Sequence, residues 1–341
     1  MINLFKHFLV SFLIYIFIFS QISVPAAQAQ QASTTVNLKV VTFPFLSFAP
    51  LYIAQDEGFF EEQGLRVEFV KMSEAAAIPA LVRGDIDVWG GLLNSNFLNA
   101  MSRGANIKIV AEKGHFSSAG CVSGAMLARK ALVESGEMHS LSQLKGRRID
   151  VSRTSYQEYF MDKLLNMAGL TPDDVEIVDV RPPGSIGALK SGQIDLTVAA
   201  EPWITRIVKA GSAVIWIPVR RVFPELEHAY IEYGPNLLEK NPEVGKRFMI
   251  AYLKGVRQAN QGKTPRNLEI ITKNTRMKRE LLQDVCWRKW HNHGRIDTKS
   301  VLEFQDWAIE KGLLDRKIPE HRFWDPRYVE HANKVLGTPP K

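Results

Sequence analysis

Cysteine is scarce in this sequence, and its scarcity excludes several classes of protein. Only Cys121 and Cys286 occur in 341 residues. Two cysteines make no disulfide framework, and no CxxC pair is present to bind a metal or to carry out redox chemistry. The long separation between the two favours buried free thiols, although an oxidising compartment would also allow a bridge.

Motifs for catalysis and for cofactor binding are lacking as well. No Ser-His-Asp order, paired-carboxylate site or phosphate-binding glycine loop stands out. His291 and His293 are two positions apart at the end of an expected helix, where such neighbours do not face each other. We therefore interpret them as a solvated helix end, and the sequence predicts no enzyme, no metal site and no cofactor.

Clusters of basic residues are also missing. The formal net charge is +7, but lysine and arginine are dispersed along the chain. Proteins that bind nucleic acid concentrate their basic residues in a patch or stripe. The charge therefore favours a small anionic ligand or a charged partner surface over nucleic acid.

Long apolar runs are confined to the start of the chain. Residues 8–19 are apolar apart from Ser11, and residues 27–29 (Ala-Gln-Ala) form a small-residue cleavage signal. The run is shorter than the roughly 20 residues that a membrane span needs. We predict a signal peptide at residues 1–29, cleaved near Ala29, and an exported mature protein; a retained anchor is the alternative.

One block of sequence occurs twice. Residues 67–70 and 80–87 return as residues 175–178 and 188–195 at a constant offset of 108, and nine of the 22 positions from 67 to 88 are identical to their partners. Each copy has the pattern of a strand, a short helix ending at a glycine, and a second strand. The repeat predicts two similar α/β lobes, and a cleft between lobes is where small molecules bind.

Local patterns predict the elements around the repeat. The first lobe is expected to contain a strand at 36–41, a helix at 51–62 and a strand at 65–70. The second is expected to contain a strand at 149–151, a helix at 155–167 and strands at 175–180 and 194–199. Residues 121–128 and 228–233 are expected to be hinge strands. Helices are expected on the first lobe at 241–261, 265–272, 279–291 and 298–311.

A polar loop before the helix at 155–167 is the candidate anion site. It consists of Ser152, Arg153, Thr154 and Ser155. A helix N-terminus offers unpaired N–H groups and a partial positive charge. Arg153 would bind a carboxylate or sulfonate through two N–H groups. The alternative is a helix cap beside a solvated arginine.

Aromatic residues form a second group of candidates. Phe43 and Phe45 flank Pro44 in the loop after the first strand, and Trp203 follows Pro202 after a later strand. Flat side chains from two lobes can enclose a ring, and each pair contributes about 0.5–1.5 kcal/mol beyond area burial. Ordinary core packing is the alternative.

The repeat itself nominates further positions at the cleft. Ligands of doubly wound sheets bind at the carboxyl ends of strands. Asn94 and Ser95 follow a strand of the first lobe at the places where the second lobe has Pro202 and Trp203. Tyr156, next to the polar loop, is expected to join them.

Glu201 has two interpretations that the sequence leaves open. Its carboxylate would accept hydrogen bonds from an amine or ring N–H of a ligand, which would favour a heterocycle over a simple anion. Alternatively it pairs with Arg220 or Arg221 and stabilises the lobe.

Several of these segments resemble a known family. They are residues 49–55 (Ala-Pro-Leu-Tyr-Ile-Ala-Gln), 58–60 (Gly-Phe-Phe), 144–146 (Leu-Lys-Gly), 188–195 and 201–202 (Glu-Pro). In this order the chain, over roughly residues 38–260, resembles the periplasmic binding proteins of ABC importers for nitrate, sulfonates, taurine and thiamine precursors.

The resemblance implies a fold. It is an α/β, two-lobed periplasmic-binding-protein fold of type II, with two hinge strands and C-terminal helices packed on lobe 1. Lobe 1 would comprise residues 36–120 and 232–341, and lobe 2 residues 121–231.

The resemblance also implies a function. The chain would be a monomeric periplasmic receptor that captures a small ligand and delivers it to an ABC permease in the inner membrane. Our preferred ligand is a small organic anion of the sulfonate or carboxylate type, with or without an aromatic ring. A neutral heterocycle, such as a pyrimidine or a riboflavin-like vitamin precursor, is the alternative. An enzyme that makes the thiamine pyrimidine shares this fold, but its cysteine-rich iron site is missing from this sequence.

Overall fold

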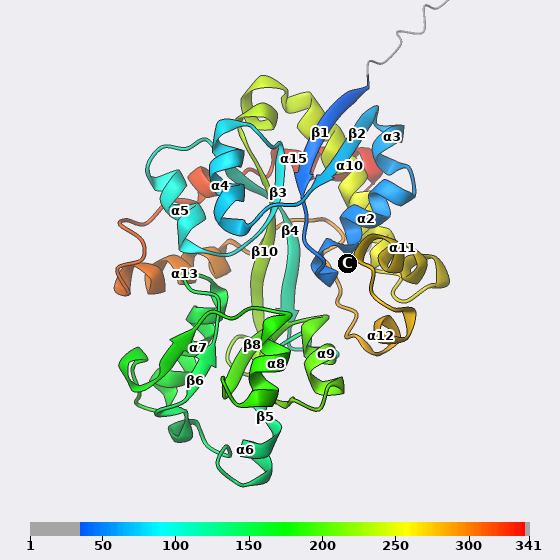
Figure 1. Cartoon of the computed structure of the whole chain (residues 1–341). Coiled ribbons are helices and arrows are strands. Elements are labelled where there is room, and N and C mark those ends of the chain that lie inside the picture. Colours follow the sequence, from blue (N-terminus) through cyan, green and yellow to red (C-terminus); the bar gives the residue numbers. More distant parts are fainter. Residues whose placement is uncertain (1–34, 338–341) are drawn as a thin grey trace, which may run out of the picture. The chain divides into compact units, whose positions relative to one another are not determined.

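Two five-stranded sheets organise the computed structural model, which describes residues 35–337 (Figure 1). The signal peptide predicted for residues 1–29 lies outside the described residues. Within residues 35–337, no helix has both the length and the apolar character that a membrane crossing requires.

The first sheet has the order β2-β1-β3-β10-β4. Its strands are β1 (Val36–Val41), β2 (Leu65–Val70), β3 (Val88–Leu92), β4 (Lys108–Ser117) and β10 (Glu225–Tyr233). β1 is parallel to β2 and β3, whereas β10 is antiparallel to β3 and β4. In β1, buried Leu38 and Val40 alternate with exposed Asn37 and Lys39, whereas Val88 and Trp89 at the start of β3 are both buried.

The second sheet repeats this arrangement in the order β7-β6-β8-β5-β9. Its strands are β5 (Gly124–Arg129), β6 (Arg148–Asp150), β7 (Glu176–Val178), β8 (Leu196–Ala200) and β9 (Ala213–Pro218). β6 is parallel to β7 and β8, and β5 is antiparallel to β8 and β9. Strands at repeated positions of the sequence thus occupy equivalent places in the two sheets, which confirms the prediction of two similar α/β halves.

The repeated glycines end equivalent helices. Gly84 follows α4 (Glu74–Arg83) and Gly192 follows α8 (Gly184–Ser191), with φ of 77° and 74°. A left-handed backbone at the end of a helix favours glycine, which has no Cβ to clash. The chain then turns directly into β3 or β8.

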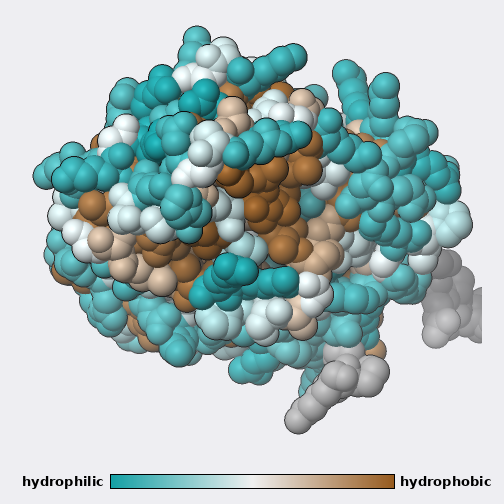
Figure 2. Space-filling model, turned by 90° about the horizontal axis from the view of Figure 1, so that it is seen from below, coloured by the Kyte–Doolittle hydropathy of each residue, from teal (hydrophilic) through white to brown (hydrophobic). Residues whose placement is uncertain are grey.

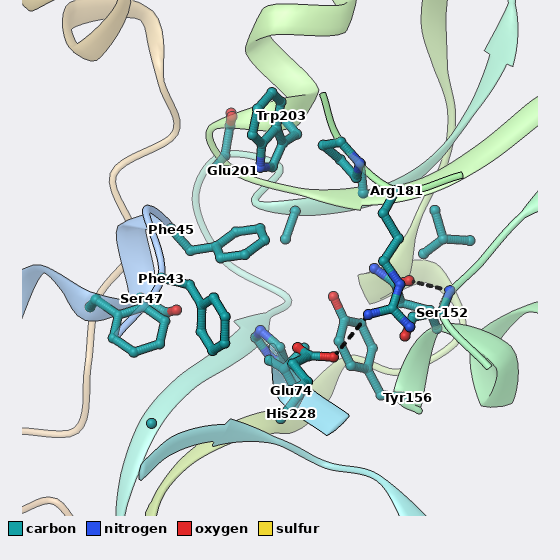
Figure 3. Close-up of a pocket in the computed structure, with 18 of the residues that line it drawn as sticks. Phe43, Phe45, Ser47, Glu74, Ser152, Tyr156, Arg181, Glu201, Trp203 and His228 are labelled. Atoms are coloured by element: carbon teal, nitrogen blue, oxygen red, sulfur yellow. Dashed lines mark hydrogen bonds and ion pairs between the residues drawn. The ribbon is translucent and has the colours of Figure 1, made fainter. Parts of the chain in front are cut away.

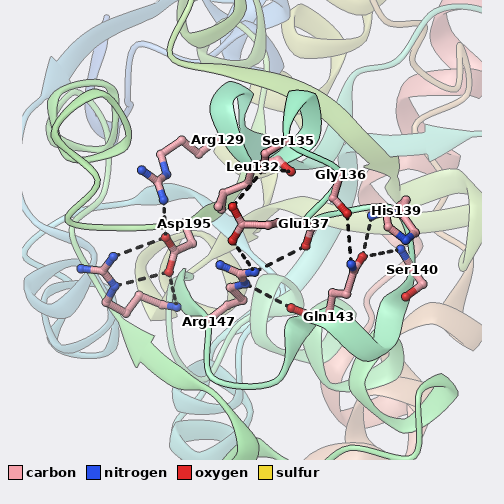
Figure 4. Close-up of polar contacts among 11 residues, drawn as sticks. Arg129, Leu132, Ser135, Gly136, Glu137, His139, Ser140, Gln143, Arg147 and Asp195 are labelled. Carbon is pink, nitrogen blue, oxygen red and sulfur yellow. Dashed lines mark hydrogen bonds and ion pairs between the residues drawn. The ribbon is translucent and has the colours of Figure 1, made fainter.

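The repeated aspartates hold that turn to the sheet. The backbone N–H of Lys39 donates to Oδ2 of Asp87 (2.8 Å), and that of Arg148 donates to Oδ2 of Asp195 (3.1 Å). In return the N–H of each aspartate donates to the carbonyl of the same strand residue, at 2.9 Å. Asp195 also binds the guanidinium groups of Arg148 and Arg129 (Figure 4). The two copies of the repeat therefore share an aspartate, Asp87 or Asp195, for a structural reason.

The C-terminal helices cover the first sheet. α10 (Pro242–Ala259) packs on α2 (Ala49–Asp56) and on α15 (Arg327–Leu336), and α11 (Pro265–Thr275) packs on α2. α13 (Thr298–Glu310) packs on β10 and also contacts α7 (Tyr156–Met167) of the second half. Between these two helices Trp307 Nε1 donates to buried Asp162 (3.0 Å), so the two halves are also joined away from the crossing strands.

Two predicted helices are shorter than expected. The helix predicted at 51–62 is divided into α2 and α3 (Phe59–Glu62) by Gly58, whose φ is 74°. The helix predicted at 279–291 ends as α12 (Arg279–Asp284). After it, the N–H groups of Cys286, Trp290 and His291 donate to side chains of Glu201, Asn260 and Glu112 instead of to helix carbonyls. The chain from 285 to 297 is therefore irregular, and His291 and His293 do not end a helix.

The first crossing overlaps the start of the hinge strand predicted at 121–128, whereas the second lies before the one predicted at 228–233. Residues 124–128 belong to β5 inside the second sheet, and residues 228–233 belong to β10 inside the first. β4 and β10 pair as far as Ser117 and Glu225, so the chain passes between the sheets at 118–123 and 219–224.

The surface carries an apolar area on one face. Figure 2 shows hydrophobic residues gathered in the middle of that face, with hydrophilic residues around them. Few large apolar side chains are strongly exposed in the described chain; Val208 and Ile215 are among them, at 40% and 39%. Most large apolar residues are in the core, which includes strands of both sheets.

Replacing Asp195 with alanine tests the role of the repeated aspartate. The change removes the acceptor of the Arg148 N–H and leaves two partly exposed guanidinium groups without their carboxylate, so we expect a loss of about 2 kcal/mol of unfolding free energy. Urea denaturation measures it. The control is Asp85→Ala, which breaks only an exposed pair with Arg83 and should cost less than about 0.5 kcal/mol. Equal effects of the two changes would contradict this role.

Candidate functional site

A pocket of about 270 Å³ lies between the two sheets. Its walls come from the carboxyl end of β3, from the loops that follow β1 and β2 of the first sheet, and from the loops that follow β6, β7 and β8 of the second. Doubly wound sheets bind ligands at these strand ends. Its lining residues include Phe43, Phe45, Ser47, Phe48, Ser73, Glu74, Leu92, Asp150, Ser152, Tyr156, Gln157, Arg181, Glu201, Trp203, His228 and Arg288.

Aromatic side chains from both halves face this pocket. Phe43 and Phe45 enter from the loop after β1, and Trp203 enters from the first turn of α9 (Trp203–Lys209) (Figure 3). Phe43 and Phe45 are half-buried, whereas Trp203 is 7% exposed and has the guanidinium of Arg206 4.6 Å from its ring centre. Pro44, between the two phenylalanines, is exposed and does not line the pocket.

A charged pair joins the two halves at the pocket. Arg181, which follows β7, lies 3.3 Å from the carboxylate of Glu74 at the start of α4 (Figure 3). Arg181 also binds Asp179, which raises its pKa, and burial raises the pKa of the Glu74 carboxyl. The two residues occupy adjacent positions of the repeat alignment, so equivalent loops meet here.

Asp150 is a pocket residue whose hydrogen-bonding capacity is taken up by the protein. Its carboxylate accepts hydrogen bonds from the hydroxyls of Ser185 (2.6 Å) and Thr197 (2.9 Å) and from the N–H groups of Val180 and Arg181. It is 3% exposed. Asp150 therefore fixes the loops after β6 and β7 and has little capacity left for a ligand.

Glu201 is engaged in a similar way. Its carboxylate accepts hydrogen bonds from the hydroxyl of Thr205 (2.8 Å), from the N–H of the same residue and from the N–H of Cys286 (3.1 Å). Burial raises its pKa. The predicted pairing with Arg220 or Arg221 is wrong, since Arg220 donates to the carbonyl of Gly120 and Glu201 instead holds the loop after α12.

The two cysteines form a disulfide, which corrects the expectation of two free thiols. The S–S distance between Cys121 and Cys286 is 2.10 Å. The bridge links the first crossing to the irregular segment 285–297, and the pairing was hidden in the sequence because 165 residues separate the two positions. It also lines a second cavity, of about 820 Å³, whose wall shares Glu201 with the pocket.

Arg288 and His228 are pocket residues that sequence reasoning missed. Arg288 belongs to the irregular segment two residues after the disulfide and is 5% exposed. Its Nη1 lies 3.4 Å from Nε2 of His228, whose ring is stacked on Phe116 with centroids 3.9 Å apart. Burial lowers the pKa of His228 well below its usual value, so the imidazole is neutral and accepts this hydrogen bond.

Behind the aromatic wall lies another buried cation. Lys113 Nζ donates to the hydroxyl of Ser47 (3.2 Å) and lies 4.0 Å from the ring centre of Phe48. Burial lowers its pKa to about 7. With a pKa of about 7, this amine is only partly charged at neutral pH.

The polar loop predicted as an anion site lies only partly at the pocket. Ser152 lines it, but Arg153 does not, and its exposed guanidinium lies 3.6 Å from the carboxylate of Glu158. The N–H of Thr154 donates to Glu158, and Ser155 caps α7 by accepting the N–H of Gln157. Side chains of α7 itself thus occupy these N–H groups.

The predicted candidates Asn94 and Ser95 meet that loop from the other half. The N–H of Ser95 donates to the carbonyl of Thr154 (2.9 Å), and the N–H of Tyr156 donates to that of Leu93 (3.0 Å). Asn94 and Ser155 form an isolated β-bridge. None of Asn94, Ser95, Thr154 and Ser155 lines the pocket, and together they join the halves beside it.

Metal binding finds no support in the side-chain arrangement. Within residues 35–337, no cluster of three or more His, Cys, Asp or Glu side chains is placed to hold an ion. The pocket lining offers aromatic contacts, hydrogen-bonding groups and charged side chains to a ligand.

Two sheets of equal strand order with a pocket at the ends of their parallel strands define the class of two-lobed binding proteins. The chain belongs to the NMT1/THI5-like family, whose sequence model matches residues 46–262, more than half of the chain.

Known proteins with similar sequences point to the same class. The chain is 28% identical over 234 residues to the taurine-binding periplasmic protein of Escherichia coli, a match that covers 65% of each chain. It is 27% identical over 154 residues to a putative thiamine biosynthesis protein of Haemophilus influenzae, covering 45% of each. The match thus spans less than two thirds of the length of either relative.

A solved structure shows the fold over a longer range. The periplasmic nitrate-binding protein NrtA from Synechocystis superposes with a TM-score of 0.73 at 15% identity, covering 89% of this chain and 90% of the other. The predicted two-lobed periplasmic-binding-protein fold is therefore confirmed.

Replacing both cysteines with serine tests the structural role of the disulfide. Because the bridge spans 165 residues, its loss should lower the unfolding free energy by about 2–5 kcal/mol. Chemical denaturation of the mature protein measures the loss. A reducing agent should produce the same loss in the wild-type protein and none in the double variant. A wild-type protein that is indifferent to reduction would contradict the bridge.

Proposed function

We propose that the chain is an exported receptor that captures a small organic ligand between its two halves and delivers it to an ABC permease in the inner membrane. One observation carries the proposal: aromatic side chains from both repeated halves line one pocket at the ends of the parallel strands. The names of the relatives, which include a taurine-binding and a nitrate-binding periplasmic protein, support it.

The walls of the pocket favour a ligand with a flat ring. Phe45 and Trp203 come from different halves, so a ring held between them would contact both and favour closure. Each aromatic contact adds about 0.5–1.5 kcal/mol beyond burial, which is consistent with micromolar binding, about −8 kcal/mol. We propose that the ligand also carries a sulfonate or carboxylate group.

Closure requires that the halves move as lobes. We propose that lobe 1 comprises residues 36–117 and 225–337 and lobe 2 residues 124–218, so that β10 belongs to lobe 1 and not, as the boundary expected at residue 231 implied, to lobe 2. The lobes would rotate about the crossings at 118–123 and 219–224, and the Glu74–Arg181 pair would form on closure because its members come from opposite lobes.

A neutral heterocycle is a second candidate ligand. Glu74 favours it, because among the three pocket carboxylates it has the fewest protein donors and would accept an N–H from a ring or amine. Asp150 and Glu201 support this candidate less, since protein donors already occupy them.

A thermal-shift screen of the mature protein tests the proposed function. It should include aromatic sulfonates and carboxylates, taurine, nitrate, pyrimidines and vitamins. A ligand at a hundred times its Kd stabilises the folded protein by about 2.7 kcal/mol. Stoichiometric, reversible binding supports the receptor, whereas turnover of a bound compound would show an enzyme. If no compound of any class shifts the melting temperature, the proposal fails.

Replacing Trp203 with alanine should weaken the hit at least tenfold while the protein remains folded. The matched control is Trp216→Ala, since Trp216 is a half-buried tryptophan on β9 that lines a different cavity. Calorimetric titration of both variants measures the change. Unchanged affinity in Trp203→Ala would remove this side chain from the site.

A further inference from the structure

Arg288 is a buried cation without a carboxylate partner. Its one hydrogen bond within residues 35–337 is the contact of Nη1 with the neutral imidazole of His228, and its Nε has no partner there. The side chain is only 5% exposed. Removing a guanidinium from water without a counter-charge is costly, and arginine keeps its proton in proteins.

The nearby carboxylates are committed elsewhere. Glu201 accepts from Thr205 and Cys286, and Glu112 accepts from the ring of His115 (2.9 Å) and the N–H of His291 (2.9 Å). Neither forms an ion pair with Arg288 among the described contacts. By contrast, the guanidinium groups of Arg148 and Arg129 bind the carboxylate of Asp195 directly.

The backbone makes room for this guanidinium. Gly114 lies beside it on β4, and a Cβ at that position would be 2.3 Å from Nη1 of Arg288. The segment that carries Arg288 is fixed on both sides, by the disulfide at Cys286 and by the bond from the N–H of Trp290 to Asn260. The side chain is thus held in place at the pocket by several independent contacts.

The pocket wall carries three carboxylates and two guanidinium groups. Glu74 is paired with Arg181, Asp150 receives four hydrogen bonds from the protein, and Glu201 receives three. Arg288 differs from these groups, because its one side-chain hydrogen bond goes to a neutral imidazole. An anionic group of a ligand would supply the direct hydrogen-bonded partner of opposite charge that this guanidinium lacks within the described residues.

We propose that Arg288 is the counter-charge of the ligand, and that it binds a planar or tripodal oxyanion, a carboxylate or sulfonate, carried by a monoanionic aromatic compound. This inference rests on the proposed function and specifies the ligand class for the same pocket. Two N–H groups of a guanidinium match two oxygens of either anion. The anionic group lies at Arg288, and the ring lies toward Phe45 and Trp203.

The first test needs no ligand. Arg288→Met removes an unbalanced buried charge and retains most of the volume, so the melting temperature of the ligand-free variant should equal or exceed that of the wild-type protein. The control is Arg148→Met, which leaves buried Asp195 without one of its guanidinium partners and should lower the melting temperature. A comparable drop in Arg288→Met would show that Arg288 is structural and overturn the proposal.

The second test compares matched probes by calorimetric titration. Benzoate and benzenesulfonate carry the anion, and benzamide and benzenesulfonamide are their neutral counterparts. We expect at least one anion to bind the wild-type protein more than tenfold tighter than its neutral counterpart. Arg288→Met should abolish this difference, and Arg148→Met, which lies outside the pocket, should preserve it.

The outcomes separate this inference from the proposed function. Equal binding of the anion and its amide to the wild-type protein would overturn the role of Arg288 and leave the receptor intact. An anion preference that persists in Arg288→Met would also overturn it. Failure of all four compounds to bind would contradict the aromatic monoanion as the ligand class, whereas the wider screen decides whether the chain is a receptor.

Discussion

The shared strand order of the two sheets sets the position of every loop that reaches the pocket. In each half one parallel strand, β1 or β6, has a neighbour on both sides. The loop that follows it therefore lies beyond the carboxyl ends of the strands. Two chain crossings and the contacts of α7 with α13 then hold these edges against each other. The repeated glycine and aspartate fix the turns that lead into β3 and β8. These turns help to set where the strands end and therefore where the pocket lies.

The charged groups of the pocket differ in how many protein partners they have, and the fold explains the difference. The carboxylates of Asp150 and Glu201 hold loops in place, because their oxygen atoms accept hydrogen bonds from protein donors. Arg288 lies on an irregular segment whose N–H groups bind side chains of other elements, and a disulfide anchors that segment. A pocket whose acids Asp150 and Glu201 are hydrogen-bonded to the protein, and whose buried Arg288 has no ion pair within the described residues, is suited to bind an anion.

The sequence predicted features that depend on residues close together in the chain better than features that depend on distant ones. The repeat, with Gly84 and Gly192 ending equivalent helices, predicted two α/β halves because the pattern is local and repeated. Phe43, Phe45 and Trp203 could be placed near strand ends for the same reason, and the structure has them at the pocket. Arg153 looked like an anion ligand because it adjoins a helix start, but Glu158 one turn later occupies it.

Long-range features were beyond such reasoning. The disulfide joins positions 165 residues apart, and the helix predicted across 279–291 ends early because distant side chains capture its N–H groups. Arg288 enters the pocket through that irregular segment. Glu74 and Arg181 were detectable in principle, since they follow strands at adjacent repeat positions.

The most direct measurement is a crystal structure of the mature protein with the tightest ligand from the screen. The account predicts a ring between Phe45 and Trp203 with its anionic oxygens within hydrogen-bonding distance of the guanidinium of Arg288. A ligand found instead in the cavity beside the disulfide, or one that leaves Arg288 without an anionic contact, would contradict it.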